Sequence, residues 1–219
     1  MKFIYLNLMC LLGGCSGTDK SVSTAEVDTS LAQVPAVCRL QSPQIAGSLI
    51  PLGNQRALTA RHLLHQPVVR VDGQLTGIEA VHDGRGGEVT AGDWAIVQIN
   101  DARLPPPDPR LVRYEFPADS PVFLCGFPTA SPHPSRPSMY RASVQQPPFW
   151  VPPQDGVVLL SVAGSPDLSG MSGGTVVIPD AEGTGWQVVG IYLGRLQSAG
   201  WTGYVVRRLP PEVEERHEN

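Results

Sequence analysis

The sequence has no excess of positive charge and no apolar run long enough to span a membrane. Its 219 residues carry 16 basic and 20 acidic side chains, and this mildly acidic balance gives no reason to propose nucleic acid as a partner. The apolar stretch at residues 3–12 is far shorter than the roughly 20 residues of a membrane-spanning helix. His62 and His65 have no acidic partner in a zinc-type pattern. We therefore expect no bound metal and no other cofactor.

The N-terminus has the pattern of a targeting segment, residues 1–14. A basic start at Lys2 and the apolar stretch are followed by Leu-Gly-Gly-Cys at residues 12–15. This pattern resembles the bacterial lipoprotein processing site, in which Cys15 would become the lipidated first residue. An ordinary secretory signal, cut elsewhere, is the alternative. Cys10 is a poorer lipidation site because two bulky residues precede it.

A lipid on Cys15 would make the following residues a tether. Residues 15–36 hold this cysteine and a stretch that is small and polar enough to be flexible, and several acyl chains on one cysteine would make the anchoring stable. The resemblance implies a protein of the bacterial cell envelope, bound to a membrane through its N-terminus, with its domain in the periplasm or outside the cell. Ser16 stands where some bacteria use an aspartate for inner-membrane retention, which slightly favours the outer membrane.

Only two cysteines, Cys38 and Cys125, follow the N-terminal segment. They are candidates for a disulfide in an oxidising compartment. The alternative for Cys125 is a buried apolar thiol, because it follows the apolar residues 122–124. Neither cysteine has the surroundings of a catalytic thiol.

Short alternating or apolar runs between glycines and prolines predict an all-β chain. The expected strands are residues 48–52, 57–60, 68–71, 75–82 and 94–99 in the first half, and residues 121–125, 139–145, 157–162, 174–178, 188–193 and 203–207 in the second. The two groups indicate two halves of one domain, residues 37–208, joined near residues 104–113. Residues 209–219 are expected to be a polar tail without chemistry.

Proline marks the connector and two expected surface loops. The prolines at residues 105–107 cannot donate ladder hydrogen bonds, so the connector is expected to be extended and semi-rigid. A proline-rich recognition segment is the alternative. The loops are residues 131–137 and 146–153. In the second loop, Phe149 and Trp150 either form an exposed apolar contact or, more ordinarily, pack over the barrel.

Three polar residues lie in settings that favour acyl-transfer chemistry. Ser172 stands in a small-residue turn, residues 170–174 (Gly-Met-Ser-Gly-Gly), ahead of an apolar run, while His62 follows one strand-like stretch and Asp93 precedes another. A serine hydroxyl needs a base to act as a nucleophile near neutral pH, and that base needs a third group to fix its tautomer. Ser172, His62 and Asp93 can supply these three roles.

Four segments resemble the landmarks of trypsin-like serine proteases, in the style of the compact bacterial members. They are residues 58–62 (Leu-Thr-Ala-Arg-His), 92–97 (Gly-Asp-Trp-Ala-Ile-Val), 170–174 and 188–192 (Val-Val-Gly-Ile-Tyr). Each motif alone is weak, and their shared order carries the resemblance. It covers residues 40–208 and implies two six-stranded antiparallel β-barrels with the active site in the cleft between them.

The resemblance also assigns the residues around the triad. The amides of Gly170 and Ser172 would hold an oxyanion, because glycines let the backbone turn sharply and aim N–H groups at it. The substrate pocket would be lined by the residues just before Ser172 and by Asp167, Ile191, Tyr192, Leu193, Gly194 and Arg195. Asp83 and Asp101 are the substitutes if Asp93 is misplaced.

Two positions depart from the family pattern. Met171 stands where many animal members carry an aspartate that pairs with a newly cut N-terminus, and no basic residue precedes residues 45–47, which resemble that start. We therefore expect no activation by such a cleavage. Thr175 replaces a common proline, which we regard as harmless because the position begins a strand.

The preferred side chain of the substrate is left open by the sequence. Asp167 could attract a basic side chain or could simply cap a loop. Tyr192 stands where glutamate-specific bacterial relatives carry a histidine, which disfavours an acidic side chain. A small or apolar side chain is the default expectation.

These patterns predict a serine endopeptidase that hydrolyses peptides or proteins through an acyl-enzyme intermediate, as a monomer by default. An esterase with the same triad is an alternative enzyme. The alternative outside enzymes is a catalytically silent, protease-like lipoprotein that binds peptides or envelope partners, because the sequence does not show whether the three side chains meet.

Overall fold

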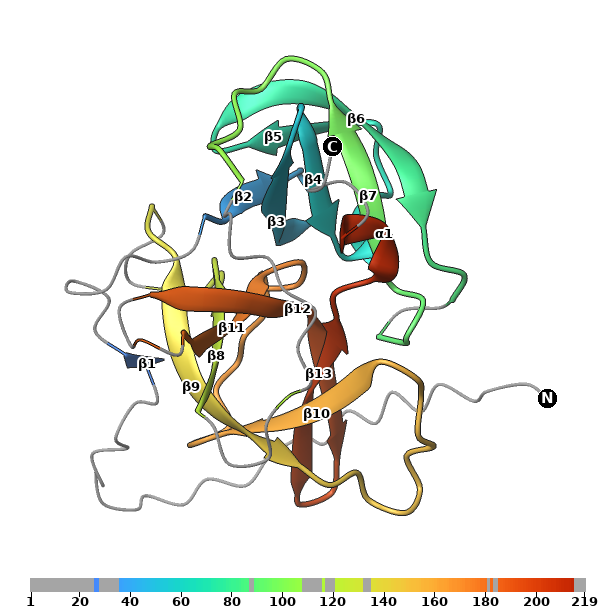
Figure 1. Cartoon of the computed structure of the whole chain (residues 1–219), viewed down its shortest axis with the longest axis vertical. Coiled ribbons are helices and arrows are strands. Elements are labelled where there is room, and N and C mark those ends of the chain that lie inside the picture. Colours follow the sequence, from blue (N-terminus) through green and yellow to red (C-terminus); the bar gives the residue numbers. More distant parts are fainter. Residues whose placement is uncertain are drawn as a thin grey trace, which may run out of the picture.

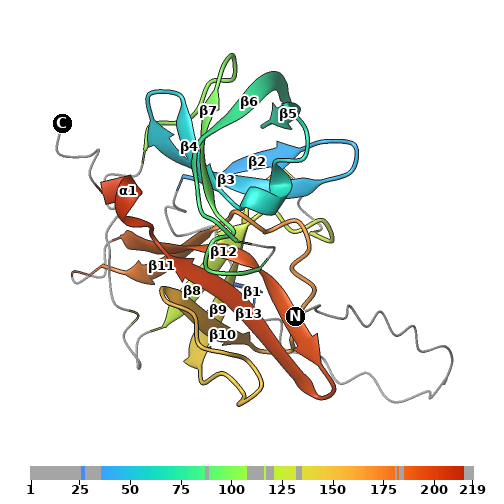
Figure 2. The same cartoon turned by 90° about the vertical axis from the view of Figure 1, so that its right-hand side faces the viewer.

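The chain folds into two antiparallel β-barrels in a computed structural model (Figure 1). The structure describes residues 26–27, 36–86, 89–107, 116, 121–131, 135–180, 182 and 185–214. The first barrel, coloured blue to green, lies above the second, coloured yellow to red, and Figure 2 shows the same arrangement after a quarter turn. The prediction of an all-β chain with two six-stranded barrels is confirmed.

Six strands close the first barrel in the order β2-β3-β4-β7-β6-β5. They are β2 (Cys38–Gln41), β3 (Ala46–Gly53), β4 (Arg56–Thr59), β5 (Val68–Val71), β6 (Gln74–Asp83) and β7 (Ala95–Ile99). Alternation decides which side chains face inward: Val69 and Val71 of β5 are buried, whereas the residues before each are exposed. The β5–β6 hairpin turns at Asp72 and Gly73, both with positive φ, which matches the twist of its strands.

The second barrel is a seven-stranded sheet that closes on itself. Its strands are β1 (Glu26–Val27), β8 (Val122–Gly126), β9 (Ser138–Gln145), β10 (Val157–Val162), β11 (Thr175–Pro179), β12 (Trp186–Ser198) and β13 (Trp201–Arg208). The order is β1-β9-β10-β13-β12-β11-β8, and an additional pairing of β8 with β9 closes the barrel and leaves β1 as a short extra strand on β9.

The expected strands agree with the structure where the apolar pattern is clear. Val68–Val71 and Val157–Val162 have the expected bounds. β2 was not expected, because four residues with only Cys38 and Leu40 buried give too short an alternation. β12 is longer than expected, because its pairing with β13 continues through the polar residues Gln197 and Ser198.

Cys38 and Cys125 are both free and buried, and they lie in different barrels, on β2 and β8. The candidate disulfide is therefore not formed. Burial raises the pKa of the Cys125 thiol to about 12, and burial together with the neighbouring Asp72 carboxylate also raises the pKa of Cys38. Both thiols stay protonated near neutral pH and have little reactivity, so Cys125 is the buried apolar thiol of the alternative interpretation.

Several expectations fall outside the described residues. The processing site, Cys15 and most of the tether lie in residues 1–25 and 28–35, and much of the connector lies in residues 108–115, so these expectations stay predictions. In the described part of the chain, no helix combines the length and the apolar character needed to cross a bilayer. The C-terminal segment begins with the one-turn helix α1 (Pro211–Glu214), in which Val213 is buried.

The central strands of the first barrel offer a direct test of its core. Leu58 on β4 pairs with Ile96 on β7, and both are fully buried. Leu58→Ala should lower the free energy of unfolding by about 2–5 kcal/mol, because it removes buried methyl groups and leaves a cavity. The measurement is urea unfolding. Leu75→Ala is the control, since this leucine on β6 is 63% exposed and its loss should change stability by less than about 0.5 kcal/mol. An equal loss of unfolding free energy in the two variants would contradict the described core.

Candidate active site

His62 is positioned by the end of β4. After this strand, Ala60 keeps an extended backbone, and a short 3-10 turn follows at Arg61–Leu63. Two contacts fix this turn. The Leu63 side chain is buried in the core, and the Arg61 N–H donates to the Asp93 carbonyl (3.3 Å). Because β4 pairs with β7 at Thr59 and Ala95, the histidine after one strand lies beside the aspartate before the other.

The Asp93 carboxylate holds both the backbone and the ring of His62. The His62 N–H donates to Asp93 Oδ1 (3.0 Å), and His62 Nδ1 lies 2.8 Å from Asp93 Oδ2. The Val89 N–H also donates to Oδ2 (2.7 Å), and Asp93 is only 1% exposed. An ionised carboxylate only accepts hydrogen bonds, so Nδ1 carries the proton and Nε2 is left as the basic nitrogen.

Asp93 is thus the aspartate that contacts the histidine, and the two substitutes are not needed. Asp83 bonds the Arg61 guanidinium (2.8 Å) at a half-exposed position. Asp101 follows β7 at its other end, where its N–H donates to the Thr76 hydroxyl (3.1 Å).

Ser172 faces the same cavity as His62. Both residues line a hollow of about 260 Å³ between the barrels. The Ser172 hydroxyl donates to the Leu193 carbonyl (3.2 Å), and no hydrogen bond between Ser172 and His62 is present among the described residues. The structure therefore brings the three predicted residues to one site, with the serine side chain turned towards β12 rather than towards the histidine.

The loop of Ser172 is fixed against the first barrel by a close backbone approach. The Ser48 N–H on β3 donates to the Ser172 carbonyl (2.8 Å), and the Thr59 hydroxyl on β4 donates to the Ser48 carbonyl (2.8 Å). Gly173 has φ +81°, and a Cβ there would overlap the Ser48 carbonyl and crowd Thr59. Only glycine allows this approach, which joins the serine loop of one barrel to the strands that carry His62 in the other.

The same loop leaves two amides without an internal acceptor. Four other amides of the loop have acceptors within it or beside it. The Ser169 N–H donates to the Asp167 carboxylate, and the Met171 N–H donates to the Leu168 carbonyl. The Gly173 N–H donates to the Tyr192 carbonyl, and the Gly174 N–H donates to the Met171 carbonyl. The N–H groups of Gly170 and Ser172, the predicted oxyanion donors, have no acceptor among the described residues. Gly170 has φ +90°, and a Cβ would crowd Phe127 and Thr129. Free amides on alternate residues of a glycine-containing turn are suited to bind an anionic oxygen.

Met171 holds this loop by apolar packing. Its side chain is fully buried in the core of the second barrel together with Leu168 and Val176. An aspartate here would need a buried cationic partner, whereas the methionine needs none. The packing supports the expectation that a newly cut N-terminus is not required to shape the loop.

Five of the six residues named for the pocket line the cavity, namely Asp167, Tyr192, Leu193, Gly194 and Arg195. Ile191 does not; it is fully buried in the hydrophobic core. Leu168 and Ser169, which lie just before Ser172, also line the cavity as expected, and so does Val89, which was not among the pocket predictions. Val89 could not have been found from a motif, because only the fold brings its loop to β12.

The Asp167 carboxylate, at the mouth of the pocket, already has partners within the chain. The Ser169 hydroxyl (2.7 Å) and N–H (3.1 Å) both donate to its carboxylate, and Arg195 Nη2 lies 3.8 Å away. These Ser169 hydrogen bonds, with a smaller contribution from the Arg195 charge, lower the pKa of Asp167 despite its partial desolvation. Asp167 therefore caps the loop, which was one of its two predicted roles, and its charge is shared with a cation.

Buried tyrosines form the wall behind Asp167. Tyr192 lies 6.4 Å from Tyr204 between ring centroids, and the Tyr204 hydroxyl donates to the Pro166 carbonyl (2.7 Å). Burial raises the pKa of Tyr204 to about 12 and raises that of Tyr192 as well. Both rings are therefore neutral, and neither phenol supplies charge to the pocket.

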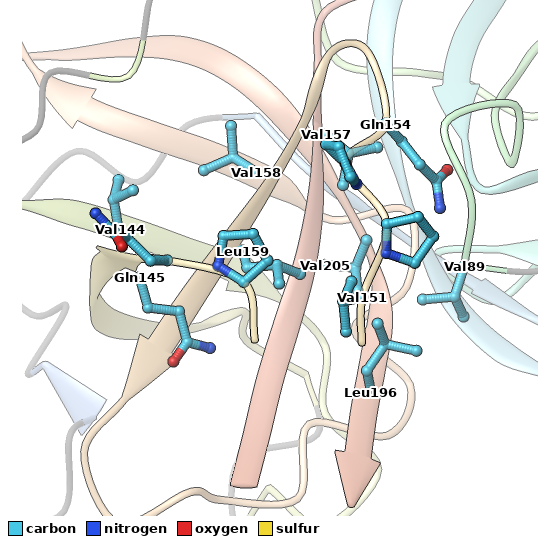
Figure 3. A pocket seen from close by; sticks show the side chains of 14 residues that line it. Val89, Val144, Gln145, Val151, Gln154, Val157, Val158, Leu159, Leu196 and Val205 are labelled. Carbon is cyan, nitrogen blue, oxygen red and sulfur yellow. The ribbon is translucent and has the colours of Figure 1, made fainter. Parts of the chain in front are cut away.

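A second, apolar cavity of about 310 Å³ adjoins the first (Figure 3). Figure 3 shows Val151, Val157, Leu196 and Val205 around it, with Val89 at one end. Val89 lines both cavities. The two loops that meet here are tied together, because the Ala91 N–H donates to the Gln154 side-chain oxygen (2.7 Å).

No known protein-family model matches the sequence, and no curated protein matches it either. Solved structures of serine proteases are similar to it. The scabies mite inactivated protease paralogue S-I1 has a TM-score of 0.61 at 17% identity over 85% of this chain and 95% of that one. Kallikrein-related peptidase 10 in complex with Zn2+ has a TM-score of 0.58 at 16% identity over 84% of this chain and 94% of that one. The inactive form of the Rv3671c protease of M. tuberculosis has a TM-score of 0.52 at 22% identity over 79% of this chain and 83% of that one.

At these identities the similarity establishes the two-barrel fold alone. Since the similar structures include an inactivated paralogue and an inactive form, a catalytic role has to be argued from this chain's own side chains.

The close approach at Gly173 can be tested by adding a single methyl group. Gly173→Ala should lower the free energy of unfolding by about 3–5 kcal/mol, because it combines a left-handed backbone with overlap of the Ser48 carbonyl. Gly73→Ala is the matched control: its φ is +84° and open space surrounds the added Cβ, so about 1–2 kcal/mol is expected. Chemical denaturation measures both. Similar losses would show that the loop does not press against β3 as described.

Proposed function

We propose that this chain is a serine endopeptidase that hydrolyses peptide bonds by acyl transfer to water. The observation that carries the proposal is the Asp93–His62 pair, because His62 lines the same cavity as Ser172 while the buried Asp93 carboxylate holds its ring. A buried carboxylate that accepts three hydrogen bonds, one of them from the imidazole, is the arrangement that prepares a histidine to act as a general base.

In the proposed reaction, the Ser172 hydroxyl leaves the Leu193 carbonyl when substrate binds and turns to Nε2 of His62. Catalytic hydrogen bonds often tighten only in the substrate complex. His62 takes the hydroxyl proton as Oγ attacks the peptide carbonyl, and then gives it to the leaving amine. Asp93 keeps the ring oriented and stabilises its protonated form. A water molecule then attacks the acyl-enzyme while His62 takes its proton, and His62 returns a proton to Ser172 Oγ as the acid product leaves.

The amides of Gly170 and Ser172 would stabilise the tetrahedral oxyanion. Each needs an acceptor in the substrate complex, since neither has one within the described chain. Donors fixed in advance at a site where negative charge develops are worth more than donors that must reorganise. The burial of Met171 between these two residues keeps the turn in this conformation.

The proposed substrate places a small or apolar side chain beside Ser172. The Asp167 charge is already engaged by Ser169 and Arg195, so a basic side chain would gain little there. Past Ile191, β12 pairs only with β13 among the described strands, and its other edge can accept an extended peptide as an added strand. Leu196 on that segment lines the apolar cavity of Figure 3, which favours a second apolar side chain upstream of the cleaved bond.

We also propose that the protein acts as a monomer in the bacterial cell envelope, anchored through a lipid on Cys15. This rests on the sequence of residues 1–15, where a short apolar segment ends in a small-residue processing pattern. The anchor would leave the barrels free on the far side of the tether, in the periplasm or outside the cell.

A catalytically silent peptide-binding module is the second candidate. The observation in its favour is the Ser172 hydroxyl, which bonds to the Leu193 carbonyl instead of the histidine. The same cavities would then hold a peptide without cutting it. This candidate predicts an intact site that does not react with serine-directed probes.

Covalent labelling distinguishes the two candidates. A fluorophosphonate probe should label the wild-type protein, and Ser172→Ala should abolish labelling while the far-UV circular dichroism spectrum is unchanged, because only an activated hydroxyl is phosphonylated. Ser143→Ala, which removes an exposed hydroxyl on β9 bonded to Ser161, is the control and should label like wild type. Labelling that survives in Ser172→Ala would remove this serine from the mechanism. Turnover of a casein or peptide library, compared with a simple ester, then separates a peptidase from an esterase.

Removing the Asp93 charge should affect turnover far more than binding. Asp93→Asn should lower kcat by about 10³–10⁴-fold with little change in KM, because the amide favours the wrong histidine tautomer. Asp83→Asn is the control, since Asp83 only pairs with Arg61 at the surface, and should lower kcat less than about twofold. Steady-state peptide hydrolysis measures both variants. A similar kcat for the two variants would exclude Asp93 from the triad.

A further inference from the structure

Two aromatic side chains, Phe149 and Trp150, stand at the tip of the β9–β10 loop. The Val151 N–H donates to the Pro148 carbonyl (2.9 Å) and closes a turn with Phe149 and Trp150 at its two central positions. Phe149 is fully exposed (101%), and Trp150 is 46% exposed. The more ordinary expectation, that both residues pack over the barrel, is wrong for Phe149.

The tip is held rigidly. Prolines at residues 147, 148, 152 and 153 flank the turn and restrict its backbone. The Trp150 ring packs edge-on against Trp201 of the β12–β13 hairpin, with 5.2 Å between centroids and 83° between planes. Gln145 ties the two hairpins together, because its amide donates to the carbonyls of Leu160 (2.9 Å) and Thr202 (3.2 Å). We call Phe149, Trp150 and Trp201 the aromatic prong.

The segments that form the aromatic prong carry no charge, and the first charged residue after them on the β9–β10 loop is Asp155. Residues 142–154 and 196–206 contain no aspartate, glutamate, lysine, arginine or histidine, although the chain has 16 basic and 20 acidic residues. Figures 1 and 2 show the β12–β13 hairpin and the first part of the β9–β10 loop at the end of the molecule away from the first barrel. The loop then returns to the first barrel, where the Ala91 N–H donates to the Gln154 side chain. This end therefore presents aromatic rings, prolines and uncharged polar groups to the solvent.

We propose that the aromatic prong docks into the interfacial region of a lipid bilayer. Tryptophan is well suited to the membrane interface, where its ring is buried while the indole N–H stays hydrated, and phenylalanine adds apolar surface on the lipid side. A rigid tip does not have to be ordered when it inserts, so little conformational entropy opposes insertion. The absence of charge in residues 142–154 and 196–206 fits this partner, because insertion of these segments takes no ionised group out of water.

The length of the N-terminal segment is compatible with this orientation. Glu26 on β1 pairs with Tyr140 on β9, and the nine residues from Tyr140 to Phe149 span at most about 30 Å. The eleven residues from Cys15 to Glu26 can span at most about 40 Å. A lipid on Cys15 and the aromatic prong can therefore reach one bilayer, so the prong would fix the orientation of a domain that the lipid already anchors.

Docking would also place the substrate cleft near the membrane. Val151, adjacent to Trp150, lines the apolar cavity that adjoins the Ser172 site. A peptide bound there would enter the cleft close to the bilayer surface. This consequence rests on the proposed function, whereas the docking itself does not.

The test measures partitioning onto vesicles of zwitterionic phosphatidylcholine. The processed chain, residues 15–219, with Cys15→Ser, which cannot be lipidated, is compared with the same chain carrying Phe149→Ser and Trp150→Ser in addition. The prong substitutions should weaken partitioning by about tenfold or more, because each removes a large aromatic surface from the lipid contact. Phe149→Ser alone should give an intermediate loss. Leu75→Ser is the control, since it removes an exposed apolar side chain from the first barrel, and should leave partitioning unchanged.

Equal partitioning of the parent and prong variants would overturn the proposal. So would a concentration-dependent dimer in sedimentation that the prong substitutions abolish without any effect on vesicles, because the prong would then bind a second copy. Peptide hydrolysis in vesicle-free solution is measured on the same variants and should stay within about twofold of the parent. Inactivity of every variant, the parent included, would count against the proposed function and leave the vesicle result to decide the docking.

Discussion

The site depends on one close contact between backbones, the Ser48 N–H on β3 and the Ser172 carbonyl at 2.8 Å. This contact needs a residue without a side chain at Gly173, because a Cβ would overlap the Ser48 carbonyl. The first barrel carries His62 and Asp93, and the second carries Ser172. Without the contact, the two halves of the site would share a chain but no fixed geometry, and a proton transfer between them requires alignment to a fraction of an ångström.

Burial on either side of this contact gives the site its electrostatic character. Asp93 is removed from water and accepts hydrogen bonds from His62 and Val89. The serine loop keeps its shape through the apolar packing of Met171. Asp167 pairs with Ser169 and Arg195 at the mouth of the pocket. The fold alone does not decide activity, since similar structures include an inactivated paralogue and the inactive form of a protease, and the proposed catalytic role rests on these side chains.

The sequence could predict the parts of the molecule that short motifs define. The barrels follow from alternating runs, and His62, Asp93 and Ser172 were found because each lies next to a strand in a recognisable context. Val89 could not be predicted, because its role depends on a loop that meets β12 only in the folded chain. The separation of Cys38 and Cys125 into different barrels, and the exposure of Phe149, are likewise outcomes of three-dimensional packing that residue type and spacing do not determine.

The most direct test of the account is a crystal structure of the protein after reaction with a fluorophosphonate. The account predicts phosphorus bonded to Ser172 Oγ, a phosphoryl oxygen within hydrogen-bond distance of the Gly170 and Ser172 amides, and His62 Nε2 facing the serine oxygen while Nδ1 remains on Asp93. A phosphoryl oxygen directed into solvent, or an imidazole turned away from Ser172, would contradict it.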